Sequence, residues 1–210
     1  MLARVHKSQF FVIRIIKINI FHVEIRKMCN KHYKKSFLKN KKVVLGENFV
    51  LHGRIYSLGT GLIEIGDNVE INSEFSVNPT GGGYGTSINS FEGAIVKIGN
   101  NVGISHTAIS AMESVEIGDN VLIGSNCMIA DTDFHPIDAE IRVKDSNNRE
   151  ATKTAPIKIE KNVFIGARSI ILKGVTIGEG SIVGAGSVVT KSIPAGEMWA
   201  GNPAKFIKKV

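Results

Sequence analysis

The chain has 210 residues, of which 43% are hydrophobic and 21% charged, proportions typical of a globular protein with a substantial core. The net charge of +7 is uneven: residues 1–42 hold twelve Lys or Arg and one acid and so carry +11, whereas residues 43–210 carry −4. Because the basic residues are confined to the N-terminal segment, we expect no nucleic-acid partner. The two cysteines, Cys29 and Cys127, are too few for a disulfide framework.

The N-terminal segment, residues 1–42, is expected to be a basic helical segment. Its apolar stretch, residues 9–21, contains Arg14 and Lys17, so it is too short and too charged to span a bilayer. Two roles remain open: packing on the body or a neighbouring subunit, or contact with an anionic membrane surface. Without a signal-peptide pattern, the expected location is the cytoplasm, either free or peripheral to the inner face of the membrane.

Aliphatic residues recur at six-residue steps along most of the remaining chain. The longest run is Ile159, Ile165, Ile171, Ile177, Val183 and Val189. The position four residues after each is small or β-branched: Val163, Ser169, Val175, Ser181 and Ser187. One earlier run is Ile117, Ile123 and Ile129, and Cys127 lies four residues after Ile123. Another is Ile65, Ile71 and Val77, and Phe75 lies four residues after Ile71.

A period of six fits neither an α-helix nor an ordinary strand, but it fits short strands joined by tight corners. Each hexad then forms one flat face of a triangular prism, with its aliphatic side chain pointing inward. Three hexads, about 18 residues, complete one turn, and successive turns stack as parallel strands. Glycine and asparagine tolerate positive φ at the corners, and Cys127 is interpreted as a buried small residue rather than a nucleophile.

This regularity resembles the hexapeptide-repeat acyltransferases, whose fold is a left-handed parallel β-helix, over about residues 45–205. Residues 183–210 resemble the C-terminal end of the sugar O-acetyltransferase branch. The resemblance implies an all-β left-handed β-helix over residues 43–203 with a loop inserted at 130–156. The C-terminal tail, residues 204–210, is expected to form a short capping helix.

The repeat breaks after Ile129 at the sequence DTDFHP, which begins a polar insertion of about 25 residues. Long insertions in compact repeats are usually either functional or disordered, and in solenoids they often lie on the binding face. His135 lies where the insertion leaves the coil, and Pro136 fixes the chain just after it. Asp131 and Asp133 are expected to hold one ring nitrogen of His135 and to raise its basicity, although turn formation is an alternative role for both aspartates.

The resemblance implies that the His-Pro pair carries the catalytic histidine. His135 would take a proton from an acceptor hydroxyl as that oxygen attacks the thioester of acetyl-CoA, with no metal required. The backbone N–H of Ala167 would stabilise the oxyanion. Asp133 is also expected to contact the acceptor. His106 stands where family members commonly have an acceptor-binding asparagine, so it is either a substrate contact or a surface residue.

The resemblance also places coenzyme A between adjacent subunits of a homotrimer. The expected cofactor-binding residues are Ala167, Ala185, Thr190, Lys191 and Lys205. Packing within the prism is the alternative role for the alanines, and solvation is the alternative for the lysines.

The expected function is acetyl-CoA-dependent O-acetylation of a sugar or surface-polysaccharide unit. An N-acetyltransferase acting on an amino sugar and a non-catalytic β-helix scaffold are the alternatives. A carbonic anhydrase of the same fold is disfavoured, because it needs three histidines on zinc and His52, His106 and His135 lack close ligand spacing. The sequence does not identify the acceptor.

Overall fold

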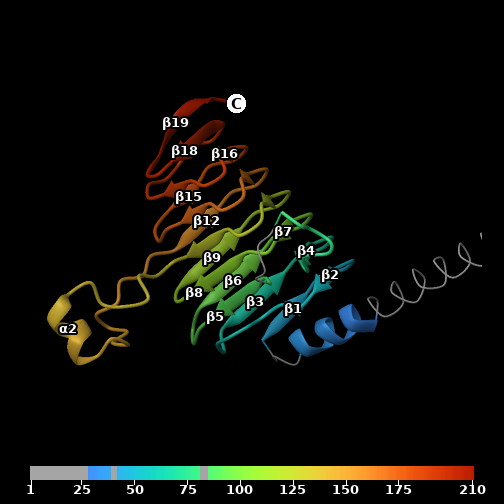
Figure 1. Ribbon diagram of the computed structural model, residues 1–210, viewed down its shortest axis with the longest axis horizontal. Helices are drawn as coiled ribbons and strands as arrows, with labels where there is room; N and C mark the ends of the chain where they lie inside the picture. Colours follow the sequence, from blue (N-terminus) through green and yellow to red (C-terminus); the bar gives the residue numbers. More distant parts are fainter. Residues whose placement is uncertain (1–27, 39–41, 81–84) are drawn as a thin grey trace, which may run out of the picture.

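A computed structural model describes residues 28–38, 42–80 and 85–210, which form a tapering stack of coils with three sheets as its faces, parallel throughout except for the last strand of one sheet (Figure 1). Sheet A contains β1 (Val43–Leu45), β3 (Leu62–Ile65), β6 (Ile95–Ile98), β9 (Ser114–Ile117), β12 (Ile157–Ile159) and β15 (Thr176–Ile177). Sheet B contains β2 (Val50–Gly53), β4 (Glu70–Ser73), β7 (Gly103–Ser105), β10 (Leu122–Ile123), β13 (Phe164–Ile165), β16 (Ile182–Val183), β18 (Glu197–Gly201) and β19 (Ala204–Lys209). Sheet C contains β5 (Ser87–Ser90), β8 (Ala108–Ala111), β11 (Met128–Ala130), β14 (Ile170–Ile171) and β17 (Val188–Val189).

From β3 to β17 the chain passes through the sheets repeatedly in the order A, B, C, so three short strands make one coil, as the period of six predicted. The fold is the left-handed β-helix that the resemblance implied. The aliphatic residues of the longest run, Ile159 to Val189, are at most 1% exposed and form the centre of the core. Ser169 and Ser187 are fully buried at corners, where their hydroxyls donate to the carbonyls of Gly166 (2.7 Å) and Gly184 (2.5 Å). Cys127 is 2% exposed, and burial raises the pKa of its thiol, which confirms its structural interpretation.

An asparagine ladder supports the edge between sheets A and B. Each side-chain amide donates to the side-chain oxygen of the next asparagine at 3.0–3.1 Å, in the order Asn48, Asn68, Asn101, Asn120 and Asn162. All five have φ between 54° and 62°, a region that costs most L-residues about 1–2 kcal/mol and that asparagine tolerates better. The ladder therefore satisfies both the corner conformation and the polar groups of neighbouring coils.

The repeat is interrupted at one place where the sequence predicted continuity. β4 ends at Ser73, and β5 of the next face begins only at Ser87. Phe75 is 58% exposed and Val77 is outside the buried core, so the assignment of these two residues to the repeat was wrong. The thirteen residues between these strands are too many for a tight corner.

A helix and a hairpin close the two ends of the prism. Residues 28–37 are helical, Phe37 joins the core, and Asn30 Oδ1 accepts a 2.9 Å hydrogen bond from Gly53 N–H. The described part of the basic segment therefore packs on the body, whereas the apolar stretch at residues 9–21 lies outside the described residues. Within the described ranges, no helix combines the length and the apolarity needed to cross a bilayer.

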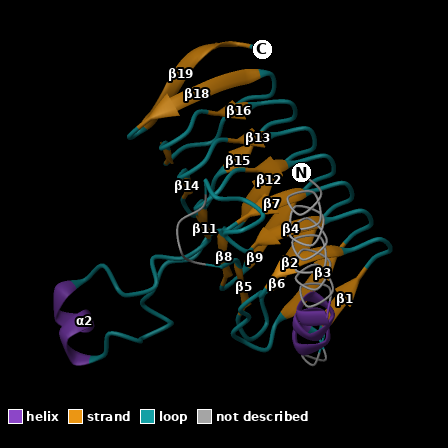
Figure 2. Cartoon of the chain, turned by 45° about the vertical axis from the view of Figure 1, so that its right-hand side comes forward, coloured by secondary structure: helices purple, strands orange, loops and turns teal. Residues whose placement is uncertain are grey.

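The predicted C-terminal capping helix is wrong, because Ala204–Lys209 form β19 antiparallel to β18 (Figure 2). One edge of β18 pairs with β16, and the other edge presents N–H and C=O groups that need partners. A returning strand supplies those partners, whereas a helix of seven residues would leave the edge open and would itself be marginal.

Asn120 offers a test of the ladder. We expect Asn120→Ala to lower the free energy of unfolding by about 1–3 kcal/mol, because it loses ladder hydrogen bonds and places alanine at positive φ. Asn120→Gly should lose less, since glycine adopts this conformation freely. Denaturant unfolding of both variants checks this, and equal stability of the two would contradict the conformational part of the argument.

Candidate active site

The insertion leaves the body at the edge between sheets C and A, termed the C–A edge. β11 ends at Ala130 and β12 begins at Ile157, and the residues between them project from the prism with the short helix α2 (Ala139–Lys144) near their tip (Figures 1 and 2). Asp138 begins α2, because its Oδ1 accepts from the N–H groups of Glu140 and Ile141 at 2.9 and 3.0 Å. No residue of α2 is buried.

His135 lies at the base of this projection with its side chain exposed. Its Nδ1 is 2.7 Å from the carbonyl oxygen of Ser146, so Nδ1 carries a proton and donates, which leaves Nε2 as the basic nitrogen. The backbone N–H of His135 donates to the carbonyl of Asp133 at 2.7 Å around Phe134, whose φ is 61°. This tight γ-turn is a strained conformation of the kind that functional sites retain. It fixes the backbone position from which the imidazole side chain of His135 extends.

Asp131 does not contact His135. The carboxylate is fully buried, and its two oxygens accept from the N–H groups of Met112 and Glu113, both at 2.7 Å. Burial raises the pKa of the Asp131 carboxyl, and these amide donors act in the opposite direction. Asp131 therefore holds the corner of the preceding coil, which is the turn-forming role left open by the sequence.

Asp133 is an ion-pair partner of Lys173, with 2.5 Å between Oδ1 and Nζ. Both side chains are about three-quarters buried, and the backbone N–H of Asp133 donates to the carbonyl of Lys153 at 3.1 Å. These contacts tie the base of the insertion to the following coil. The expectation that an aspartate orients the imidazole was wrong, because the carbonyl of Ser146 does so.

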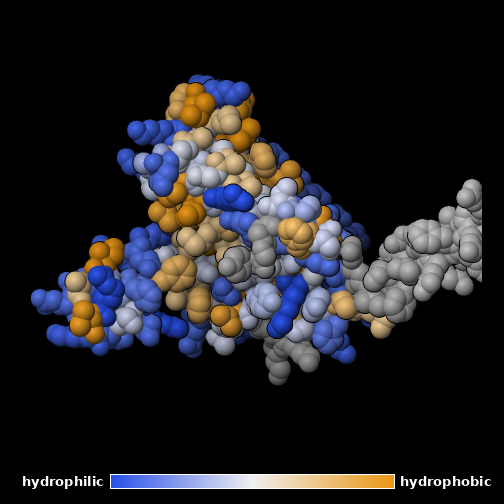
Figure 3. All heavy atoms as spheres, viewed as in Figure 1, coloured by the Kyte–Doolittle hydropathy of each residue, from blue (hydrophilic) through white to orange (hydrophobic). Residues whose placement is uncertain are grey.

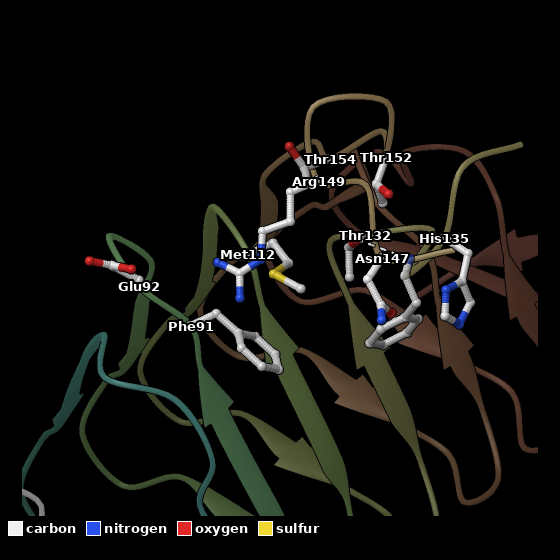
Figure 4. Close-up of a pocket in the computed structure, with 10 residues that line it drawn as sticks. Phe91, Glu92, Met112, Thr132, His135, Asn147, Arg149, Thr152 and Thr154 are labelled. Atoms are coloured by element: carbon white, nitrogen blue, oxygen red, sulfur yellow. Dashed lines mark hydrogen bonds between the residues drawn. The ribbon is translucent and has the colours of Figure 1, made fainter. Parts of the chain in front are cut away.

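A cavity of about 610 Å³ opens beside His135 (Figure 4). Corners of three successive coils contribute Phe91, Met112 and Thr132 to its wall, and the insertion contributes Asn147 and Arg149. Sequence reasoning missed Lys173, Ser146 and these pocket residues, because none belongs to a local motif.

The remaining predicted residues divide between two edges of the prism. Thr190 and Lys191 follow β17 at the C–A edge, on the same edge as His135. The edge between sheets B and C, termed the B–C edge, carries Ala167 after β13 and Ala185 after β16. Sheet C separates these edges, so one chain does not bring Ala167 to His135. Lys205 is exposed on β19, where it pairs with Ala200 of β18.

His106 also lies on the B–C edge, between β7 and β8. It is 4% exposed and has a φ of 43°, so the surface role considered for it was wrong. Its backbone N–H donates to the carbonyl of Asn72 in the preceding coil, and its own carbonyl accepts from Asn126 in the next.

A family model described as the hexapeptide repeat of succinyl-transferase matches residues 114–130 and 156–191. The chain is 46% identical over 96 residues to a putative acetyltransferase of Schizosaccharomyces pombe and 42% identical over 97 residues to galactoside O-acetyltransferase of Escherichia coli. Each match covers 46% of this chain and, respectively, 44% and 45% of the relative. The chain thus spans about half the length of the curated relatives it matches.

Solved structures match over more of the chain. A mutant of AntD, an N-acyltransferase from Bacillus cereus in complex with dTDP-4-amino-4,6-dideoxyglucose and coenzyme A, has a TM-score of 0.64 and 29% identity, covering 83% of this chain and 88% of that one. The polySia-specific acetyltransferase NeuO has a TM-score of 0.54 and 27% identity, with 80% and 81% of the two chains covered.

The two aspartates should differ in what they stabilise. We expect Asp131→Ala to lower the free energy of unfolding by about 2–5 kcal/mol, because it removes a fully buried carboxylate and leaves the N–H groups of Met112 and Glu113 without their acceptor. Asp133→Ala should cost less, since it breaks a partly exposed ion pair. Chemical denaturation of both variants measures the difference, and a smaller loss for Asp131→Ala would refute its assigned role.

Proposed function

We propose that the chain is a hexapeptide-repeat acyltransferase that transfers the acetyl group of acetyl-CoA to a hydroxyl group of a sugar or surface-polysaccharide unit. The observation that carries this proposal is the arrangement of His135. This exposed histidine lines a cavity, and its Nδ1 is held by a hydrogen bond to the backbone carbonyl of Ser146. The similarity to galactoside O-acetyltransferase and to AntD with bound coenzyme A supports the donor and the sugar acceptor.

In the proposed reaction, Nε2 of His135 takes the proton of an acceptor hydroxyl while that oxygen attacks the thioester carbonyl. A tetrahedral oxyanion forms, and the backbone N–H of Ala167 donates to it. Collapse of this intermediate breaks the carbon–sulfur bond, and the protonated imidazole returns its proton to the departing sulfur of coenzyme A. The acceptor leaves as an acetyl ester, and no covalent enzyme intermediate is needed.

The separation of His135 from Ala167 by sheet C supports a site shared by two copies of the chain in a homotrimer. The C–A edge of one copy would face the B–C edge of the next, and coenzyme A would lie between them. Thr190 and Lys191 would then meet the cofactor from the first edge and Ala185 from the second, with Lys205 near the phosphates. Asp133 remains a proposed acceptor contact, and its Oδ2 is buried without a hydrogen-bond partner among the described residues.

The surfaces of the three sheets support the same assembly. Sheet A has an alternating row of charges in register, Glu64, Lys97, Glu116 and Lys158. Sheets B and C expose apolar residues, including Leu122, Phe164 and Met128 at 56%, 46% and 36%, and sheet A exposes Val44 and Ile95 at 56% and 41%. Hydrophobic side chains also lie around α2 (Figure 3), where Ile137 and Val143 are 63% and 87% exposed. Apolar surface of this extent commonly marks a contact between chains.

An N-acetyltransferase acting on an amino sugar is the second candidate. It is favoured by AntD, an N-acyltransferase whose bound ligand is an amino sugar nucleotide. The proposed base and oxyanion donor would serve either acceptor, since both reactions move a proton from the attacking atom to sulfur. The acetyltransferase relatives favour both enzymes over a non-catalytic scaffold.

The role of His135 can be tested with a screen of sugar acceptors and acetyl-CoA. We expect His135→Ala to lower the transfer rate by at least ~10²-fold, because the general base is lost while the fold remains. His52→Ala, which changes a histidine on sheet B, should leave the rate unchanged and serves as the control. Comparable turnover by wild type and His135→Ala would refute the proposed base.

Mixing two inactive variants tests whether the site is shared. His135→Ala alters the C–A edge, and Ala185→Trp blocks cofactor approach at the B–C edge. Co-refolded in equal amounts, they should form trimers in which about a quarter of the interfaces combine two unaltered edges, so part of the activity returns. Sedimentation equilibrium confirms assembly of the mixture. A mixed trimer without activity would contradict a site built from two copies.

A further inference from the structure

Arg149 is a cation within the cavity beside His135. The cavity wall is otherwise largely uncharged, with Phe91 and Met112 on one side and threonines and Asn147 on the other. In Figure 4, the guanidinium of Arg149 is directed toward Phe91 and Met112, whereas His135 lies on the opposite side of the pocket. A molecule filling the cavity would therefore meet an imidazole at one end and a guanidinium at the other.

The guanidinium of Arg149 makes no ion pair within the described part of the chain, although Glu92 lies on the same cavity. Figure 4 shows the carboxylate of Glu92 directed away from the other pocket residues. Arg142, also in the insertion, differs, because its Nη1 donates to the carbonyls of Pro136 and Ile137, both at 2.8 Å. Arg142 thus stabilises the fold of the insertion, while the hydrogen-bond donors of Arg149 remain available to a ligand.

We propose that the acceptor is an acidic sugar whose anionic group, a carboxylate or a phosphate, binds Arg149. This inference rests on the proposed acetyl transfer and names the substrate class of that site. A guanidinium presents paired N–H donors that match two oxygens of either anion. The side-chain amide of Asn147 adds a donor, and the ring of Phe91 offers an apolar surface to the face of the sugar.

The cavity geometry connects anion binding to the position of acetylation. A volume of about 610 Å³ lies within the range of small-molecule sites and holds a sugar unit together with its anionic substituent. An anion fixed at Arg149 sets the distance from that substituent to the reacting hydroxyl at Nε2 of His135. A neutral sugar would desolvate Arg149 without replacing its hydrogen bonds, so the pocket would discriminate against it.

Matched acceptor pairs test this inference. One pair is a uronic acid and its parent neutral hexose, and the other is a sugar phosphate and its unphosphorylated parent. For at least one pair, we expect the wild type to favour the acidic member in kcat/KM by about 10- to 100-fold, the range for charge-assisted hydrogen bonds. The pair that shows the preference identifies the anion as carboxylate or phosphate.

Variants then assign the preference to one side chain. Arg149→Ala should abolish the preference for the acidic member, and Arg149→Lys should retain part of it, because lysine keeps the charge but not the paired donors. Lys144→Ala removes a cation from α2 of the same insertion and should leave the preference unchanged. Equal kcat/KM for acidic and neutral acceptors in the wild type would overturn the inference but not the transfer reaction. An equal loss of kcat/KM for both acceptors after Arg149→Ala would do the same.

A binding measurement keeps the result independent of turnover. Calorimetric titration of each acidic sugar into His135→Ala and into the double variant His135→Ala/Arg149→Ala reports affinity without chemistry. A 10-fold or greater loss caused by the second substitution supports the anion site even if acetyl transfer itself is absent. Affinity that is unchanged for both acidic sugars overturns it.

Discussion

Close contact between the backbones of successive coils is the constraint on which the rest of the structure depends. A Cβ atom added to Gly166 would lie 2.5 Å from the backbone nitrogen of Ala185, and one added to Gly124 would lie 2.6 Å from that of Ala167. Real Cβ atoms do not approach other atoms this closely, so glycine is required at these corners. The coils can then stack in register, and each face buries one aliphatic side chain per turn.

This constraint determines where chemistry can occur. The faces of the prism are short parallel strands in register and its interior is filled, so irregular segments leave the coil at corners. The insertion does so at the C–A edge, where a γ-turn and the Asp133–Lys173 ion pair fix its base and Ser146 fixes the imidazole. The proposed oxyanion donor lies on another edge, and for this reason we propose a site shared by two copies of the chain.

The sequence predicted the prism because each inward position of a face must be aliphatic and each corner small, which leaves a visible period of six. It also predicted the place of the insertion, because the period stops at Ile129. It did not predict which groups contact the aspartates or the imidazole, since these contacts join different coils or distant parts of the insertion. Asp131 bonds Met112, 19 residues away, and Asp133 bonds Lys173, 40 residues away. The C-terminal strand was missed for the same reason, because its pairing partner β18 decides its conformation.

The most direct test of the shared site is a crystal structure of the protein with coenzyme A bound. We expect a trimer in which the sulfur of coenzyme A lies within hydrogen-bond reach of His135 Nε2 in one copy. The pantetheine chain should run along the B–C edge of the adjacent copy, past Ala167 and Ala185. Coenzyme A bound within a single copy, or bound away from His135, would contradict a site shared by two copies.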